Sequence, residues 1–367
     1  MFVIANIRPV GHNIGNSAIN FALRNMLYET FGRLVTIIEF PASSKHESTA
    51  KAGLTKKTIH DINRYADGVI IGGGNLYEND EIAVDLDSLA NLLPPLMLFS
   101  NSRGRIYGRD ARLHERSDVI SDNKFKTLLD ASDISLSRDT ATVEYAKKLG
   151  LRDQIGYCPT INIKNYLERI PNLPKDEYVG ALISIRTPDL MNIPVRFQCR
   201  VPDDINAFID ILFRNGHKRV RILCNDSRDL DFSQQFKGSR NIDTLHTNDV
   251  YEYLSVLRKA SMVVSYRLHA TLPAISMGTP NVNIIYDERA CSLSSDLKIG
   301  DVGSNMITDA DFRNSICQKI AAGGYTASDH KKISKYWDKI SDMQYQQLVQ
   351  FKSLVSSYVE KNRLFDV

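Results

Sequence analysis

Arg267 and His269 stand two positions apart at the end of an apolar run. That run closes at Tyr266, and a helix-like stretch follows directly from Ala270. Both side chains should therefore lie at a strand-to-helix junction, where free amide groups and the helix dipole disfavour a cation unless an anion is bound. Arginine binds phosphate or carboxylate through two parallel hydrogen bonds, and histidine exchanges protons near neutral pH. We interpret the pair as an anion-binding, acid–base site; a structural histidine is the alternative.

A second group of candidates follows the first apolar run, residues 2–7. The stretch GHNIGNSA contains Asn13, Gly15 and Asn16 and leads into a helix pattern over residues 16–31. Glycine permits a tight turn, and asparagine or serine caps a helix. Amide groups at such a helix start suit an anion or a carbonyl oxygen. An ordinary strand-to-helix turn explains the same residues equally well.

Three further strand ends carry residues that suit a ligand. One ends in three glycines and an asparagine, which allow close backbone approach, although a bare glycine run is a weak signal. Two others end in arginines, which are either ligand-binding cations or solvated charges; Arg138 precedes Asp139, and a surface ion pair is the simpler interpretation there. The candidates at these ends are Gly72, Gly73, Gly74, Asn75, Arg138 and Arg186.

Several function classes are disfavoured by the sequence. The glycine run is not G-x-G-x-x-G and no G-x-x-x-x-G-K occurs, so the usual phosphate loops of nucleotide binders have no support. The chain has 46 Lys and Arg against 43 Asp and Glu, a net charge of +3 without a basic stripe, which argues against a nucleic-acid partner. The five cysteines form no CxxC pair and accompany no histidine cluster, so we expect reduced thiols and no metal site.

The chain also shows no sign of export or membrane insertion. Its first apolar stretch is too short and too soon polar for a signal peptide. No apolar run reaches the roughly 18 residues of a membrane span. We expect a cytoplasmic protein, and peripheral contact with the inner face of the membrane stays open.

The elements that must position these residues alternate between strand and helix in both halves of the chain. Fully apolar strands between helices predict parallel sheets covered on both faces. Residues 169–175, with two prolines and an asparagine, have the composition of a linker. We predict an α/β protein with two doubly wound domains, residues 1–170 and 176–325. Ligands of such sheets bind beyond the carboxyl ends of the strands, in the cleft between the domains.

A long amphipathic helix is predicted over residues 328–362. Its apolar positions fall near one stripe, which Gln344 interrupts. We expect the helix to pack back onto one or both domains. A coiled-coil contact with a partner chain is the alternative, and a homodimer stays open.

Four motifs occur in order between Asn13 and Arg289: NIGNSAI, DGVIIGGG, SLSRD and VVSYRLHATLPAISMGTPNVNIIYDER. They resemble the polysaccharide pyruvyl transferase family, and the Arg-Leu-His element followed by a Gly-x-Pro turn is the most specific part. The resemblance implies a GT-B-like fold, with two Rossmann-like domains facing each other across a cleft. We assign donor binding to the C-terminal domain and the acceptor to the N-terminal domain.

The resemblance also implies a reaction, the transfer of pyruvate from phosphoenolpyruvate onto two hydroxyls of a sugar to form a ketal. The acceptors are units of bacterial surface polysaccharide, such as exopolysaccharide or capsule, or lipid-linked oligosaccharide precursors. No metal or other cofactor is implied, since phosphoenolpyruvate is a co-substrate. Its phosphate and carboxylate need the cations and helix-start amides that the strand ends offer.

Each matched position receives a role from this resemblance. Arg267 is the first candidate for the anion clamp, and His269 is the acid or base of one step; we assign both as catalytic. The remaining donor-binding candidates are Leu268, Arg138, Arg186 and Arg289. The candidates for the acceptor side and its loops are Asn13, Gly15, Asn16, Gly72, Gly73, Gly74 and Asn75.

Two positions depart from the family pattern. Asn16 stands where the family often has aspartate, and an amide cannot act as a base. Arg289 stands where the family often has lysine, which keeps the charge but changes its geometry. The loops at residues 41–57 and 103–116 are expected to build the acceptor face.

Two rival functions stay open. One is a GT-B glycosyltransferase that uses a nucleotide sugar, although GTPNVNIIYDER continues as a strand without an obvious ribose-binding acid. The other is a non-catalytic glycan-binding protein on the same fold, for which His269→Ala would leave function intact.

Overall fold

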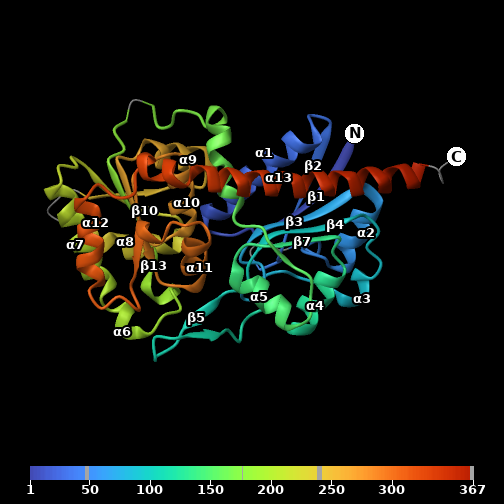
Figure 1. Cartoon of the computed structure of the whole chain (residues 1–367), viewed down its shortest axis with the longest axis horizontal. Coiled ribbons are helices and arrows are strands. Elements are labelled where there is room, and N and C mark those ends of the chain that lie inside the picture. The colour runs from blue at the N-terminus through green and yellow to red at the C-terminus, as the bar shows by residue number, and fades with distance from the viewer. Residues whose placement is uncertain (46–48, 176, 238–241, 364–367) are drawn as a thin grey trace.

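The computed structural model describes residues 1–45, 49–175, 177–237 and 242–363, and it shows two α/β halves side by side with one long helix running across both (Figure 1). The first half holds a six-stranded parallel sheet in the order β2-β1-β3-β4-β7-β8. Its strands are β1 (Phe2–Arg8), β2 (Val35–Pro41), β3 (Gly68–Gly74), β4 (Leu96–Asn101), β7 (Ile134–Ser137) and β8 (Gln154–Ile155). Its helices are α1 (Ile14–Phe31), α2 (Lys56–Tyr65), α3 (Leu86–Leu89), α4 (Asp122–Asp130) and α5 (Thr140–Lys148).

The second half repeats this plan after the 3₁₀ segment η1 (Pro159–Arg169), with the sheet order β11-β10-β9-β12-β13-β14. Its strands, also parallel, are β9 (Ala181–Ile185), β10 (Val220–Cys224), β11 (Asp243–His246), β12 (Met262–Ser265), β13 (Asn281–Ile285) and β14 (Gly303–Asn305). Its helices are α6 (Val195–Gln198), α7 (Val201–Arg214), α8 (Leu230–Ser233), α9 (Val250–Lys259), α10 (Leu268–Ser276), α11 (Glu288–Asp296) and α12 (Phe312–Ala321). The predicted pair of doubly wound α/β units is confirmed, and each sheet falls inside one of the two predicted ranges.

Helix α1 begins two residues earlier than the sequence pattern predicts. Asn13, rather than Asn16, is its N-cap, and the Asn13 side chain accepts a hydrogen bond from the Gly15 amide at 3.0 Å. The same turn joins the two halves, because the Ile14 amide donates to the carbonyl of Asn225 at 2.8 Å. The start of α1 therefore lies against the end of β10.

A short hairpin links the halves on another side. Strands β5 (Arg105–Tyr107) and β6 (Leu113–Glu115) leave the first half, and Tyr107 packs into the hydrophobic core of the second. The Tyr107 hydroxyl accepts a hydrogen bond from the side chain of Asn305 at 2.8 Å. Figure 1 shows β5 below the gap between the two sheets. Three-residue strands carry too little periodicity for the sequence to have predicted this arm.

The C-terminal helix α13 (Ala327–Arg363) contacts both halves. Near its start, the Trp337 indole donates to the carbonyl of Leu297 at 3.0 Å, in the second half. Further along, Phe351 packs edge-to-face on Phe31, with ring centroids 6.2 Å apart, in the first half. No helix in the described residues is both long and apolar enough to cross a membrane.

Gln344 interrupts the apolar stripe of α13 because it makes buried hydrogen bonds. Its amide group donates to the carbonyl of Gly156 at 2.6 Å, and its oxygen accepts from Asn162 at 2.6 Å. Gln344→Ala should lower the free energy of unfolding by about 1–3 kcal/mol, since it leaves two buried partners unsatisfied. Urea unfolding measures this change. Gln346→Ala, at an exposed position of the same helix, is the matched control and should have almost no effect; equal losses in both variants would contradict the role of Gln344.

Candidate functional site

A polar cavity of about 500 Å³ lies between the carboxyl ends of the two sheets. It is lined by residues that follow β1, β3 and β7 in the first half and β9, β10, β12 and β13 in the second. Nine of the predicted site residues line this one cavity: Asn13, Asn16, Asn75, Arg138, Arg186, Arg267, Leu268, His269 and Arg289.

Arg138 is the fully buried cation of this cavity. It follows β7, and its side chain is 0% exposed. One terminal nitrogen donates to Asn75 Oδ1 at 2.6 Å and to Ser102 Oγ at 2.5 Å. Its Nε and its other terminal nitrogen have no hydrogen-bond partner, and no carboxylate pairs with it, among the described residues. A buried charge without a counter-ion is costly, so this guanidinium is arranged for an anion that enters the cavity.

His269 lies in the first turn of α10 with 9% of its surface exposed, and its Nε2 is buried without a hydrogen-bond partner among the described residues. Burial lowers the pKa of His269 well below the ordinary value, and the positive charges of Arg138, Arg289 and Arg267 lower it further. The imidazole is therefore neutral at pH 7. In this state it is ready to accept a proton and cannot donate one as an imidazolium.

Gly15 fixes the position of this histidine from the first half. A Cβ atom on Gly15 would lie 2.6 Å from His269 Cβ and 2.9 Å from its Nδ1, both too close for real contacts. Gly15 is thus not a wall of the cavity but the surface against which the imidazole packs.

Gly15→Ala should displace the imidazole while leaving the fold intact. Helix α1 accepts alanine, which has the better helix propensity, but the added methyl group would lie 2.6 Å from His269 Cβ. Side-chain rotation cannot relieve this contact, so the starts of α1 and α10 must move apart and carry the imidazole with them. We expect turnover to fall about 100-fold, as for comparable misplacements of reacting groups, with an unchanged far-UV circular dichroism spectrum. Gly300→Ala, at an exposed glycine where an added Cβ meets no atom within 4 Å and no left-handed backbone is required, controls for loss of a glycine. Full turnover by Gly15→Ala would show that the contact does not position His269.

Arg267, the first candidate from the sequence, has a carboxylate partner. Its Nε donates to the carbonyl of Ile185 at 3.0 Å, and its Nη2 forms a buried ion pair with Asp229. Asp229 lies in a short 3₁₀ turn after β10 and is itself 0% exposed. The pair holds the Arg267 side chain at the cavity wall with its charge largely compensated.

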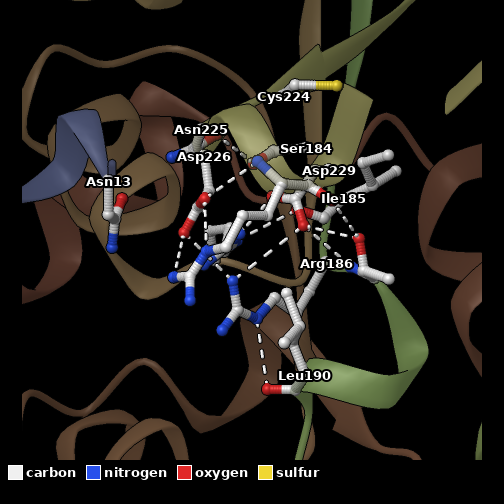
Figure 2. A network of polar contacts seen from close by, with 12 residues as sticks. Asn13, Ser184, Ile185, Arg186, Leu190, Cys224, Asn225, Asp226 and Asp229 are labelled. Carbon is white, nitrogen blue, oxygen red and sulfur yellow. Dashed lines mark hydrogen bonds and ion pairs between the residues drawn. The ribbon is translucent and has the colours of Figure 1, made fainter. Parts of the chain in front are cut away.

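Arg186 belongs to the same network (Figure 2). Its Nε donates to the carbonyl of Leu190 at 3.2 Å, and its Nη1 lies 3.2 Å from Asp226 and 3.9 Å from Asp229. Asp226 also accepts two hydrogen bonds from Arg228, at 2.9 and 2.6 Å. Burial alone would raise the pKa of Asp226, but Arg228 and Arg267 lower it overall, so the network stays charged.

Arg289 pairs with two carboxylates that the sequence analysis did not select as site residues. Its Nε donates to Asp287 at 2.9 Å, and its Nη1 lies 3.3 Å from Glu78 of the first half. Glu78 is 2% exposed and lies in the loop after β3. Burial raises the pKa of Glu78 to about 7 despite the nearby charges of Arg289 and Arg116. Its neighbours in the sequence, NLYEND, are typical of any polar surface loop. Only the tertiary structure shows that Glu78 is buried beside the cavity.

The glycine run has a packing role in this structure. Gly72, Gly73 and Gly74 do not line the cavity, in contrast to the loop-lining place that the sequence analysis gave them. A Cβ on Gly72 would lie 2.3 Å from Leu23, and one on Gly73 would lie 2.3 Å from Ile19, both on α1. The glycines therefore let α1 approach β3 closely, which carries Asn13 and Gly15 to the cavity.

The loops expected to form the acceptor face contribute unequally. Lys45 and Arg105 line the cavity, whereas Arg103 lies over the ring of Tyr145 at 3.7 Å, outside it. Arg109 is exposed on the tip of the β5–β6 hairpin. Residues 46–48 of the loop 41–57 lie outside the described residues.

Comparison with protein families gives an identification for the central part of the chain. Residues 114–288 match the family model described as "Polysaccharide pyruvyl transferase". This range contains Arg138, Arg186, Arg267, Leu268 and His269. The resemblance predicted from the motifs is confirmed. Residues 114–288 are similar to this family, and the match supports transferase activity. No curated protein sequence matches the chain.

Solved structures similar to this chain include three UDP-GlcNAc 2-epimerases. The enzyme from Methanocaldococcus jannaschii, in complex with UDP-GlcNAc and UDP, has a TM-score of 0.53 at 12% identity, over 88% of this chain and 91% of its own. The enzyme from Neisseria meningitidis, bound to UDP-GlcNAc, has a TM-score of 0.53 at 8% identity, over 98% and 100%. The Rickettsia bellii enzyme has a TM-score of 0.53 at 12% identity, over 95% and 98%. At these identities the likeness shows the fold alone, which is of the predicted GT-B type.

Proposed function

We propose that this protein is a pyruvyl transferase that moves pyruvate from phosphoenolpyruvate onto two hydroxyls of a sugar in a bacterial surface polysaccharide or its precursor, forming a ketal and releasing phosphate. The observation that carries the proposal is Arg138, buried without a carboxylate partner among the described residues and facing the same cavity as the neutral His269. Such a cation needs an anionic ligand, and phosphoenolpyruvate supplies both a phosphate and a carboxylate.

The second half supplies further groups for the donor. Helix α10 begins at Leu268, and no side chain caps its first turn. The Ala270 amide donates to the carbonyl of Arg267 at 2.9 Å, which leaves the amides of Leu268 and His269 for an anion. Arg267 and Arg186 stand beside this helix start, and each has one terminal nitrogen that takes no part in the ion pairs with Asp226 and Asp229. In the proposal these groups bind the donor against the second half, and Arg138 contacts it from the first half.

The proton transfers of this reaction require one group that enters the reaction as a neutral base. The methylene carbon of phosphoenolpyruvate gains a proton and becomes a methyl group, and the two sugar hydroxyls lose one proton each. One of these protons ends on the methyl group and the other on the released phosphate. His269 is suited to accept the hydroxyl proton as the C–O bond forms, because its imidazole enters the reaction unprotonated.

The acceptor is proposed to bind the amide-rich wall of the first half. Asn13, Asn16 and Asn75 line that wall, and amides match the donors and acceptors of sugar hydroxyls. Asn16 cannot take a proton from a hydroxyl, so it orients the sugar and leaves the base role to His269.

The test incubates the protein with phosphoenolpyruvate and candidate glycans, free and lipid-linked, and follows phosphate release and glycan mass. The proposal predicts phosphate release only when an acceptor is present, together with a mass gain of one pyruvate less one water. Thermal shift with phosphoenolpyruvate and with UDP-sugars separates the rival nucleotide-sugar transferase, since a bound ligand stabilises the folded state. Stabilisation by UDP alone, without ketal formation, would contradict the proposal.

A further inference from the structure

Glu78 links an arginine of each half at the edge of the cavity. Its Oε2 lies 3.2 Å from Arg116 Nη1 and 3.3 Å from Arg289 Nη1. Arg116 follows the β5–β6 hairpin of the first half, whereas Arg289 lies in the first turn of α11 in the second. The Glu78 side chain is 3% exposed, so this contact is shielded from water.

Arg289 faces two carboxylates from these contacts. Asp287 accepts from its Nε at 2.9 Å and also pairs with its Nη2, while Glu78 faces its Nη1. When both carboxylates are ionised, the positive charge of Arg289 is more than offset. An anionic ligand then meets little attraction from this guanidinium and repulsion from Glu78, and the low dielectric of a buried site strengthens both effects.

The two carboxylates differ in how they respond to pH. Burial alone would raise the pKa of Asp287, but Arg289 lowers it overall, so Asp287 stays ionised. Burial and, to a smaller degree, the charge of Asp287 raise the pKa of Glu78, the charges of Arg289, Arg116 and Arg138 oppose this, and the net result is a pKa of about 7. Of these two partners, Glu78 is thus the one that changes charge near neutral pH.

We propose that Glu78 is a positioning residue that sets how much positive charge Arg289 offers to an anion in the cavity. The ionised carboxylate holds and neutralises Arg289, and the protonated form releases its charge to the ligand. The proposal predicts that the affinity for an anionic ligand falls as pH rises through neutrality. Its application to phosphoenolpyruvate rests on the proposed function.

The test uses sulfate as the probe, because sulfate stays doubly charged across the whole pH range. Calorimetry at pH 6.0 and pH 8.5 should show about tenfold weaker sulfate binding at the higher pH in the wild-type protein. This is the change expected if bound sulfate shifts the pKa of Glu78 by about one unit. Glu78→Gln keeps the shape without the charge and should bind sulfate equally well at both pH values. Burial lowers the pKa of His269 well below its ordinary value, so this histidine is not expected to produce the change. The comparison is repeated in a His12→Asn background, because His12 also lines the cavity.

The matched control is Asp118→Asn. Asp118 pairs with Arg116 but not with Arg289, so the pH dependence should remain as in the wild type. A Glu78→Gln variant with wild-type pH dependence would overturn the proposal, and so would a wild-type protein whose sulfate affinity does not change with pH. Where Glu78→Gln does not fold, a wild-type affinity that stays constant with pH still overturns the proposal.

Turnover measurements separate this proposal from the proposed function. Glu78→Gln should lower the KM for phosphoenolpyruvate at pH 8.5 and leave kcat within about twofold, since a positioning residue of this kind affects binding. A loss of kcat with an unchanged KM would assign Glu78 to proton transfer and overturn the proposal. If neither protein releases phosphate from phosphoenolpyruvate, the proposed function fails, while the sulfate result still decides the role of Glu78.

Discussion

Arg138→Met is expected to remove most phosphate release from phosphoenolpyruvate without destabilising the protein. The variant loses the charged hydrogen bonds that Arg138 would make to the donor, which corresponds to a fall in kcat/KM of about 100-fold. Stability should be unchanged or higher, because an unpaired buried cation costs desolvation energy that a methionine of similar shape does not. Steady-state kinetics and a thermal melt measure the two effects.

Arg152→Met is the matched control, since Arg152 is exposed on the surface. It should keep both activity and melting temperature. If Arg138→Met retained full activity, or if it melted well below the wild type, Arg138 would be a structural residue held by Asn75 and Ser102, and the anion site would lose its main support.

His269→Gln is expected to lower kcat by about 10²–10⁴, the usual contribution of a positioned acid–base group. The pH profile should also change. Because burial lowers the pKa of His269, the wild-type enzyme should keep its base neutral down to well below pH 6.5, and its rate should fall only below that point. The residual rate of the variant should lack this acidic limb. Rate measurements across the acidic and neutral range test both expectations.

The same substitution has a predicted effect on stability. Below pH 6.5 the unfolded chain binds a proton at position 269 that the folded protein does not, so the wild type loses stability as pH falls. His269→Gln should therefore be less sensitive to acid in urea unfolding. His60→Gln, on the exposed side of α2, is the control and should behave as the wild type. Normal turnover by His269→Gln would remove the histidine from the mechanism and favour a glycan-binding protein.

The strand ends of the site were predictable, because parallel sheets place ligands at their carboxyl edges. Apolar runs that stop at Arg138, Arg186 and Tyr266 locate those edges directly in the sequence. The relative importance of the arginines was not predictable. Arg267 was the first candidate, yet Asp229 compensates its charge, and nothing in the sequence links a short turn after β10 to that arginine.

Two further features depend on contacts between distant segments. A glycine run at a strand end indicates close approach, but whether a ligand or a helix approaches is decided by α1, which packs on Gly72 and Gly73. The pKa of Glu78 is raised by burial and by Asp287, against the opposing charge of Arg289, and both of these neighbours belong to the other half of the chain. The local sequence predicts neither the packing role of the glycines nor the raised pKa of Glu78, since both arise from contacts in the folded protein.

The hairpin arm has a consequence for how the protein folds. Tyr107 comes from the first half of the chain but packs in the hydrophobic core of the second. Helix α13, which follows both halves in the sequence, contributes to both cores. Neither half can finish its own interior alone. A chain cut within residues 169–175 should therefore yield fragments that are unstable apart and recover native structure on mixing, and the intact protein should melt in one cooperative step.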